Sequence, residues 1–158
     1  FALCQSLIQH RIYDLKYKSS LNFSPLHFFK TIAFIIFVTI KIRKMLLKEI
    51  ICLLEASLVY GEQYLNKEIK KAFAADLMSD VLRLNTEDMI LITGMANLQV
   101  LRTAEMSDVS YILFVRNKKV TPEMLALAEE NGIAVMQCKQ SMFKVCGELY
   151  KAGLEPVF

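Results

Sequence analysis

Three short apolar runs stand out in the second half of the chain, and a segment with helical spacing of apolar residues follows each one. The runs occupy residues 89–93, 110–115 and 133–137. Short runs that are apolar throughout are typical of parallel strands covered on both faces. Strands that alternate with helices in this way predict right-handed crossovers and a parallel sheet. We therefore predict an α/β fold whose C-terminal half runs β-α-β-α-β-α.

The three helical segments are recognised by stripes of apolar residues on one face. The stripes consist of Leu98, Leu101 and Ala104, then Met124, Leu127 and Ala128, and finally Met142, Val145, Cys146 and Leu149. Such stripes at a spacing of three and four residues are typical of helices that cover a sheet. Gly147 lies inside the last helix, where glycine costs about 1 kcal/mol of helix propensity against alanine. We expect this glycine to allow close packing against a neighbouring element.

Capping residues predict where two of these helices begin and end. Thr121 followed by Pro122 predicts a helix start, because the hydroxyl accepts a backbone N–H and proline suits the first helical position. Gly132 predicts the left-handed end of that helix. Ser141 and Gly153 bracket the last helix in the same way.

The chain before the first apolar run has weaker signals. Apolar residues in 45–55 recur at helical spacing and predict an amphipathic helix. Residues 57–60 predict a short strand that ends at Gly61, and the alternation in 67–75 predicts another. Asp76 is placed to cap a short helix that follows. The whole prediction is a small, mostly parallel sheet with flanking helices, its C-terminal half preceded by a helix and two short strands.

The first 44 residues differ in composition from the rest of the chain. They carry seven Lys/Arg against one Asp, a balance of +6, whereas residues 45–158 carry twelve Lys/Arg against fifteen Asp/Glu, a balance of −3. They also hold six of the ten Phe and both His, but no Gly, Met or Glu. Phe, Ile, Lys, Asn and Tyr are the residues of AT-rich codons, so we interpret 1–44 as non-native translation of upstream DNA and 45–158 as the domain.

The alternative is that residues 26–40 form a membrane anchor followed by a basic flank. A helix of that length spans about 22 Å, short of the roughly 30 Å hydrocarbon core of a bilayer. Lys30 interrupts the apolar run, and no small-residue cleavage site follows it. We therefore do not expect a membrane partner unless 26–40 is a true anchor.

Several functions are disfavoured by what residues 45–158 lack. A net charge of −3 leaves no basic stripe for nucleic acid. There is no histidine to activate a Ser or Cys nucleophile and no glycine-rich phosphate loop. The chain has four cysteines, Cys4, Cys52, Cys138 and Cys146, without a C-x-x-C pair. We expect a non-enzyme without cofactor or metal, with Cys52 and Cys146 as small buried apolar residues and reduced thiols, as in the cytoplasm.

Polar residues gather where the predicted strands end. The carboxyl ends of parallel strands meet at one edge of a sheet, where ligands of such folds bind. The candidate ligand-binding residues in these loops are Thr93, Gly94, Asn97, Arg116, Lys118, Lys119, Lys139 and Ser141. Four cationic side chains beside helix N-termini favour a small anionic or phosphorylated ligand. The alternative is that these charged loops are only solvated surface.

Longer stretches of the sequence resemble a known family. Residues 74–82, 90–106, 110–138 and 139–154 resemble the DRTGG domain, and the chain is most similar to its short stand-alone members. It is also similar to the DRTGG segments of phosphotransacetylases, HPr kinase and some CBS-containing pyrophosphatases. The resemblance implies an α/β fold, a regulatory or assembly role beside a partner enzyme, a homodimer, and a link to hydrogenase or other redox systems. An alternative that it also implies is an accessory subunit or remnant of a phosphotransacetylase-like phosphotransferase.

The residues that give this family its name are not conserved in place here. With the strands in register, the Asp-Arg pair falls near Ala96 and Asn97, and Thr-Gly-Gly falls near Val115, Arg116 and Asn117. None of these five residues matches. The resemblance therefore assigns no ligand role to any residue, and the predicted site rests on the topology of the sheet.

Overall fold

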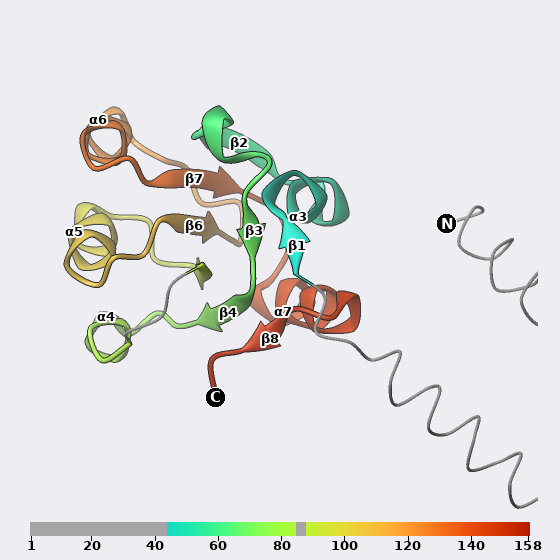
Figure 1. Ribbon diagram of the computed structural model, residues 1–158. Coiled ribbons are helices and arrows are strands. Elements are labelled where there is room, and N and C mark those ends of the chain that lie inside the picture. Colours follow the sequence, from blue (N-terminus) through green and yellow to red (C-terminus); the bar gives the residue numbers. More distant parts are fainter. Residues whose placement is uncertain (1–43, 85–87) are drawn as a thin grey trace, which may run out of the picture. The chain divides into compact units, whose positions relative to one another are not determined.

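The three predicted strands lie side by side and parallel in the computed structural model, which describes residues 44–84 and 88–158 (Figure 1). They belong to a six-stranded sheet with the order β2-β7-β6-β5-β4-β8. Its strands are β2 (Ser57–Tyr60), β4 (Lys71–Ala74), β5 (Met89–Thr93), β6 (Tyr111–Phe114), β7 (Ala134–Gln137) and β8 (Glu155–Pro156). All neighbours pair in parallel except β2, which is antiparallel to β7. The predicted α/β fold with a mostly parallel sheet is confirmed.

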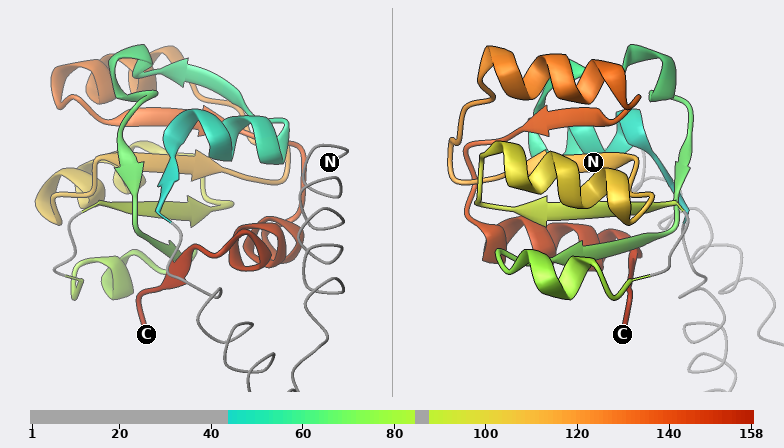
Figure 2. Two further views of the ribbon diagram at one scale, coloured as in Figure 1. Left: turned by 45° about the vertical axis from the view of Figure 1, so that its right-hand side comes forward. Right: turned by 90° about the vertical axis from the view of Figure 1, so that its left-hand side faces the viewer.

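Helices cover both faces of this sheet. They are α3 (Leu47–Leu54), α4 (Met78–Val81), α5 (Leu98–Met106), α6 (Pro122–Glu130) and α7 (Met142–Ala152). Helices α4, α5 and α6 lie against one face, and α3 and α7 lie against the other (Figures 1 and 2). A separate antiparallel pair is formed by β1 (Met45–Leu46) and β3 (Glu68–Ile69), with a 3-10 turn, η1 (Glu62–Tyr64), before β3.

Alternate residues of the central strands enter two different apolar clusters. In β5, Ile90 and Ile92 pack with residues of α3 and α7, whereas Leu91 packs with residues of α5 and α6. All five residues of β5 and all four of β6 are buried. Burial of each large apolar side chain contributes about 1.5–3 kcal/mol. Burial on both faces explains why these strands appear in the sequence as continuous apolar runs.

The predicted caps of the last two helices are also confirmed. The hydroxyl of Thr121 accepts the backbone N–H of Met124 at 3.3 Å, and the hydroxyl of Ser141 accepts that of Lys144 at 3.3 Å. Gly153 ends α7 with φ +98°. This conformation costs a residue with a Cβ more than it costs glycine.

The N-terminal elements differ from the prediction in their boundaries. The first helix begins at Leu47 and not at Met45, because Met45 and Leu46 pair with β3. The predicted strand 67–75 is two strands, since Lys70 leaves the ladder and donates its backbone N–H to the carbonyl oxygen of Asp88 at 2.9 Å.

Two predictions about side-chain surroundings are wrong. Among residues 44–84 and 88–158, no atom of a packed neighbour lies within 4 Å of a Cβ built on Gly147, so this glycine does not allow close packing against another described element. Cys52 is exposed, because it lies on the outer side of α3, whereas Cys146 is half-buried.

The proposed anchor 26–40 lies outside the described residues. Within 44–84 and 88–158, no helix is long and apolar enough to cross a membrane.

Candidate functional site

One carboxylate joins the ends of three neighbouring strands. Asp76 follows β4, and its Oδ1 accepts the backbone N–H of Gly94 at 2.7 Å and the hydroxyl of Thr93 at 3.0 Å. Its Oδ2 accepts Nη2 of Arg116 at 2.6 Å. The Thr93 hydroxyl oxygen in turn accepts the backbone N–H of Met95 at 3.1 Å. We call Asp76, Thr93, Gly94 and Arg116 the Asp76 cluster.

The hydrogen bonds of this cluster stabilise the ionised form of Asp76. Partial burial raises the pKa of Asp76, but the donors on Gly94, Thr93 and Arg116 outweigh this effect and hold the pKa below its ordinary value. The ion pair remains accessible to water, because the Arg116 and Asp76 side chains are 48% and 43% exposed. The cluster is therefore a polarised site that a solute can reach.

Gly94 is required for this arrangement. A Cβ at this position would overlap the guanidinium of Arg116. The guanidinium therefore lies directly over the glycine backbone. Thr93, one residue earlier, is fully buried and holds the strand end in place through its two hydrogen bonds.

The prediction that Asp76 caps the short helix is wrong. The residue that precedes α4 is Leu77, and no side chain caps this helix. The carboxylate of Asp76 is instead bound by donors that lie 17 to 40 residues further along the chain. Sequence reasoning missed its role because those donors are local only in the folded sheet. The available signal was its position directly after a strand, at the edge where Thr93 and Arg116 were expected.

The loop after β6 has an unusual backbone. Arg116 and Asn117 both adopt the left-handed conformation, with φ of 60° and 54°. Their N–H groups donate to the carbonyl oxygens of Gln140 at 2.8 Å and Cys138 at 3.0 Å. These bonds tie the loop after β6 to the loop after β7 and so bring two of the predicted loops together.

The left-handed backbone at Arg116 and Asn117 can be compared with the residues that the family has at these positions. Arg116 and Asn117 are the positions where that register places the two glycines of Thr-Gly-Gly. Left-handed φ values favour glycine over other residues. The chain thus retains a conformation suited to a glycine pair while presenting a guanidinium and an amide there.

The other predicted site residues fall into two groups. Asn97 and Ser141 cap helices, since their side chains accept the N–H groups of Val100 at 3.2 Å and Lys144 at 3.3 Å. The three lysines of the site, Lys118, Lys119 and Lys139, are exposed. Within the described part of the chain they form no ion pair.

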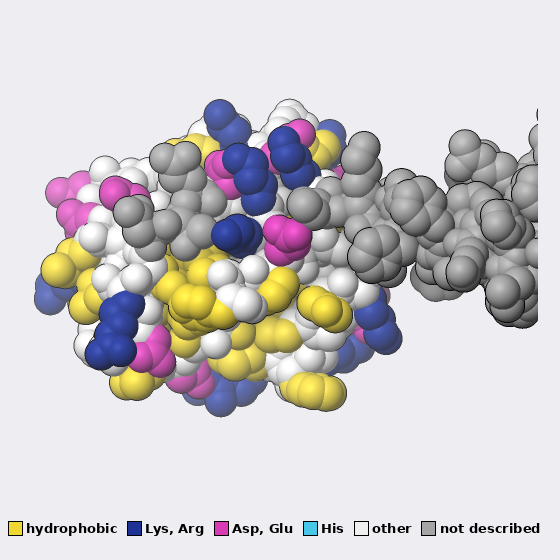
Figure 3. All heavy atoms as spheres, turned by 60° about the horizontal axis from the view of Figure 1, so that its bottom comes forward, with side chains coloured by type: hydrophobic (Ala, Val, Ile, Leu, Met, Phe, Trp, Pro, Cys, Tyr) yellow, Lys and Arg dark blue, Asp and Glu magenta, His cyan; other side chains and the backbone are white. Residues whose placement is uncertain are grey.

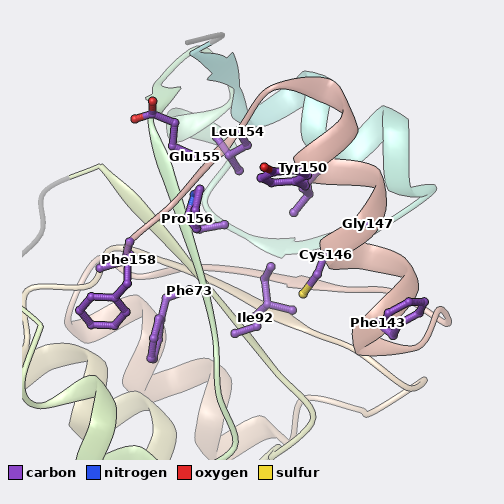
Figure 4. Close-up of a pocket in the computed structure, with 14 residues that line it drawn as sticks. Phe73, Ile92, Phe143, Cys146, Gly147, Tyr150, Leu154, Glu155, Pro156 and Phe158 are labelled. Carbon is purple, nitrogen blue, oxygen red and sulfur yellow. The ribbon is translucent and has the colours of Figure 1, made fainter. Parts of the chain in front are cut away.

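A metal site and an apolar groove are two other kinds of candidate site. No group of three His, Cys, Asp or Glu that could hold a metal ion occurs among residues 44–84 and 88–158. An apolar groove of about 410 Å³ runs between α7, β4 and the C-terminal residues (Figure 4), but none of the eight predicted residues lines it. The Asp76–Arg116 pair, whose two side chains are partly exposed, lies outside this groove.

The parallel sheet, its two helical layers and the polar cluster at its carboxyl edge define a small α/β domain with one polar rim. The family model for the DRTGG domain matches residues 49–152. The chain belongs to the DRTGG domain family.

A solved structure shares this fold. It contains the CBS and DRTGG domains of the regulatory region of Clostridium perfringens pyrophosphatase, complexed with its activator, diadenosine tetraphosphate. The similarity has a TM-score of 0.54 at 18% identity and covers 63% of this chain. It covers 44% of the other chain, so this protein spans less than half of that regulatory region. The comparison with curated proteins found no match.

Proposed function

We propose that residues 45–158 form a regulatory domain, without catalytic activity of its own, that binds a small anionic or phosphorylated ligand at the carboxyl edge of the sheet. Membership of the DRTGG family supports the regulatory part of this proposal. The related regulatory region from C. perfringens was crystallised with a polyphosphate activator. We further propose that the domain acts in the cytoplasm, as a homodimer, beside a partner enzyme.

The observation that carries the ligand proposal is the convergence of three donors on Asp76. A backbone N–H, a hydroxyl and a guanidinium within 2.6–3.0 Å of a carboxylate are the groups that bind phosphate and carboxylate oxygens in general. Without a ligand, the Asp76 carboxylate accepts the hydrogen bonds of all three donors. An external anion therefore competes with Asp76, above all for Arg116.

The surrounding charge supports this competition. Lys118 and Lys119 follow Arg116 in the same loop, and Lys139 lies in the loop that is tied to it. All three side chains are exposed. They add positive charge near the pair, and within the described residues none of them has an ion-pair partner to leave. Binding of an anion would release Asp76 and with it the segment that leads from β4 into α4.

Calorimetric titration of the full chain with inorganic phosphate, pyrophosphate and ATP tests this proposal. Arg116→Glu should weaken binding at least tenfold, because it replaces the central cation with a negative charge. Asp76→Asn should tighten binding, because it removes the competing charge and leaves Arg116 available. Lys151→Glu makes the same charge change in the last turn of α7, whereas the predicted site residue Ser141 lies at the start of this helix. It is the matched control and should bind as the parent chain does.

Two results would overturn the ligand site. One is the absence of binding by all three anions below millimolar concentration. The other is binding that Arg116→Glu and Lys151→Glu weaken equally, since this would indicate a general effect of net charge.

A further inference from the structure

Helix α7 exposes an aromatic stripe on the side that borders the apolar groove. Phe143 is 90% exposed and Tyr150 is 71% exposed. Between them lies Gly147, which has open space where a Cβ would be. Large apolar side chains on a charged protein surface are informative when they gather in this way.

The stripe continues into the groove beside α7. Phe73 and Ile92 of the sheet line the groove, and the C-terminal residues form its far side (Figure 4). Phe158 is 89% exposed and meets Phe73 edge to face, with the ring centroids 5.9 Å apart. Hydrophobic side chains gather over this edge of the molecule (Figure 3).

Charge is nearly absent from the lining of the groove. Among the described residues that line it, Glu155 is the one that is acidic or basic. The centres of protein interfaces are depleted in charged residues and enriched in Phe and Tyr. A stripe of this composition is typical of the buried centre of a protein–protein interface and not of a surface that faces water.

We propose that two copies of this chain pair through the side of α7 that borders the groove, together with the groove itself, with the two helices antiparallel. Phe143, Cys146 and Tyr150 follow one another at spacings of three and four residues, which places them along one side of α7, and Gly153 ends the helix three residues further on. In an antiparallel pair, Phe143 of one copy lies opposite Gly153 of the other, and Tyr150 lies opposite Cys146. A contact between identical copies must be complementary to itself, and large residues set against small ones satisfy this condition.

The charged residues of α7 permit this pairing. Helical spacing places Lys144, Glu148 and Lys151 beside the stripe and not within it. Two copies therefore bring no like charges into the seam, and the long stems of the two lysines can cover its border.

The available area is close to what a stable dimer needs. At roughly 200 Å² for a whole aromatic side chain, the exposed parts of Phe143, Tyr150 and Phe158 amount to about 500 Å² per copy. A standard interface buries about 800 Å² per partner, and small ones somewhat less. This inference rests on the homodimer of the proposed function and names its surface.

Light scattering on the full chain tests the surface. The parent chain should be a dimer, and Phe143→Glu and Tyr150→Glu should each raise the dissociation constant at least a hundredfold. Met106→Glu is the matched control, because Met106 is 75% exposed on α5, at the opposite face of the sheet. This variant should remain dimeric.

Cross-linking supplies a measurement that leaves the aromatic residues in place. In a chain with Cys4→Ser and Cys52→Ser, a short bifunctional maleimide should join two copies through Cys146. Adding Cys146→Ser should abolish the cross-linked species, since Cys138 is buried.

The outcomes separate the surface from the rest of the proposed function. A monomeric parent chain overturns the dimer together with this surface. A dimer that survives both glutamate substitutions, or that cross-links without Cys146, overturns the surface alone. Binding of anions by Phe143→Glu, measured by the titration above, should equal that of the parent chain, so failure of the ligand site is detected independently.

Discussion

Arg116 Nη2 lies 2.6 Å from Asp76 Oδ2, and this contact bridges two strands that are not neighbours in the sheet. Asp76 follows β4 and Arg116 follows β6, with β5 between them. Gly94, the first residue after β5, lies between them and donates its N–H to Oδ1 of Asp76. One carboxylate therefore binds the ends of three strands, and a substitution at any one of these ends should alter the hydrogen bonds at the other two.

The contribution of Asp76 to stability should depend on pH. Its pKa in the folded chain is below the ordinary value of 3.8, so its stabilising effect is present above about pH 4 and is lost as the pH falls through the lower, folded value. Asp76→Asn should lower the free energy of unfolding by about 1 kcal/mol at pH 7, a modest amount because solvent screens the exposed pair. Urea unfolding between pH 3 and pH 7 measures this difference. A difference that stays constant to pH 3 would contradict the ionic origin.

Gly94→Ala should act through Arg116. The added methyl group would overlap the guanidinium, which is the mobile end of a long side chain, so Arg116 should move and lose its contact with Asp76. The expected loss in the free energy of unfolding is about 1 kcal/mol or less. In a chain that already carries Arg116→Ala, the same substitution should cost less, as a double-mutant cycle would measure. Equal costs in both chains would show that the methyl group meets something other than Arg116.

Gly61→Ala should be far more costly than a glycine substitution at an open position. Gly61 has φ +107°, and its Cβ would lie 2.6 Å from Cβ and 2.9 Å from Cα of Ala134. Gly61 directly follows β2, and Ala134 belongs to β7, with which β2 pairs, so neither backbone can yield easily and a loss of more than about 2 kcal/mol is expected. Gly147→Ala is the control and should stabilise the chain by up to about 1 kcal/mol, since it removes a helix-interior glycine without a clash. Thermal unfolding of both variants measures the contrast.

The thiols should react in the order of their exposure. Cys52 is exposed, whereas burial raises the pKa of the Cys138 thiol and also that of Cys146. Only the thiolate attacks a disulfide reagent, so a buried thiol with a raised pKa reacts slowly. With Cys4→Ser, an aromatic disulfide reagent at pH 8 should modify Cys52 first and Cys138 last. Cys138 reacting as fast as Cys52 would show that the β7 end opens readily.

Features with a local cause could be predicted from the sequence. Strands β5, β6 and β7 are buried on both faces, so they appear as apolar runs. Thr121 and Ser141 bond to N–H groups only three residues away, which sequence spacing reveals. The carboxyl edge was likewise predictable, because parallel strands bring Thr93, Gly94 and Arg116 to one side.

Features that depend on distant neighbours could not be predicted. Asp76 has an ordinary capping position in the sequence, and only the fold brings Gly94 and Arg116 to its carboxylate. The glycine at 147 gives a low helix propensity, but propensity says nothing about what lies outside the helix. The break at Lys70 depends on the carbonyl of Asp88, which directly precedes β5, the neighbouring strand of the sheet.

The outermost strand, β8, places Pro156 in register with Ala72 of β4. Proline has no N–H to offer, and the strand is only two residues long. This border of the sheet therefore makes a poor template for another strand, whether from a partner or from a growing fibril. A sheet terminated in this way can carry exposed aromatic residues beside its rim without inviting open-ended stacking of strands.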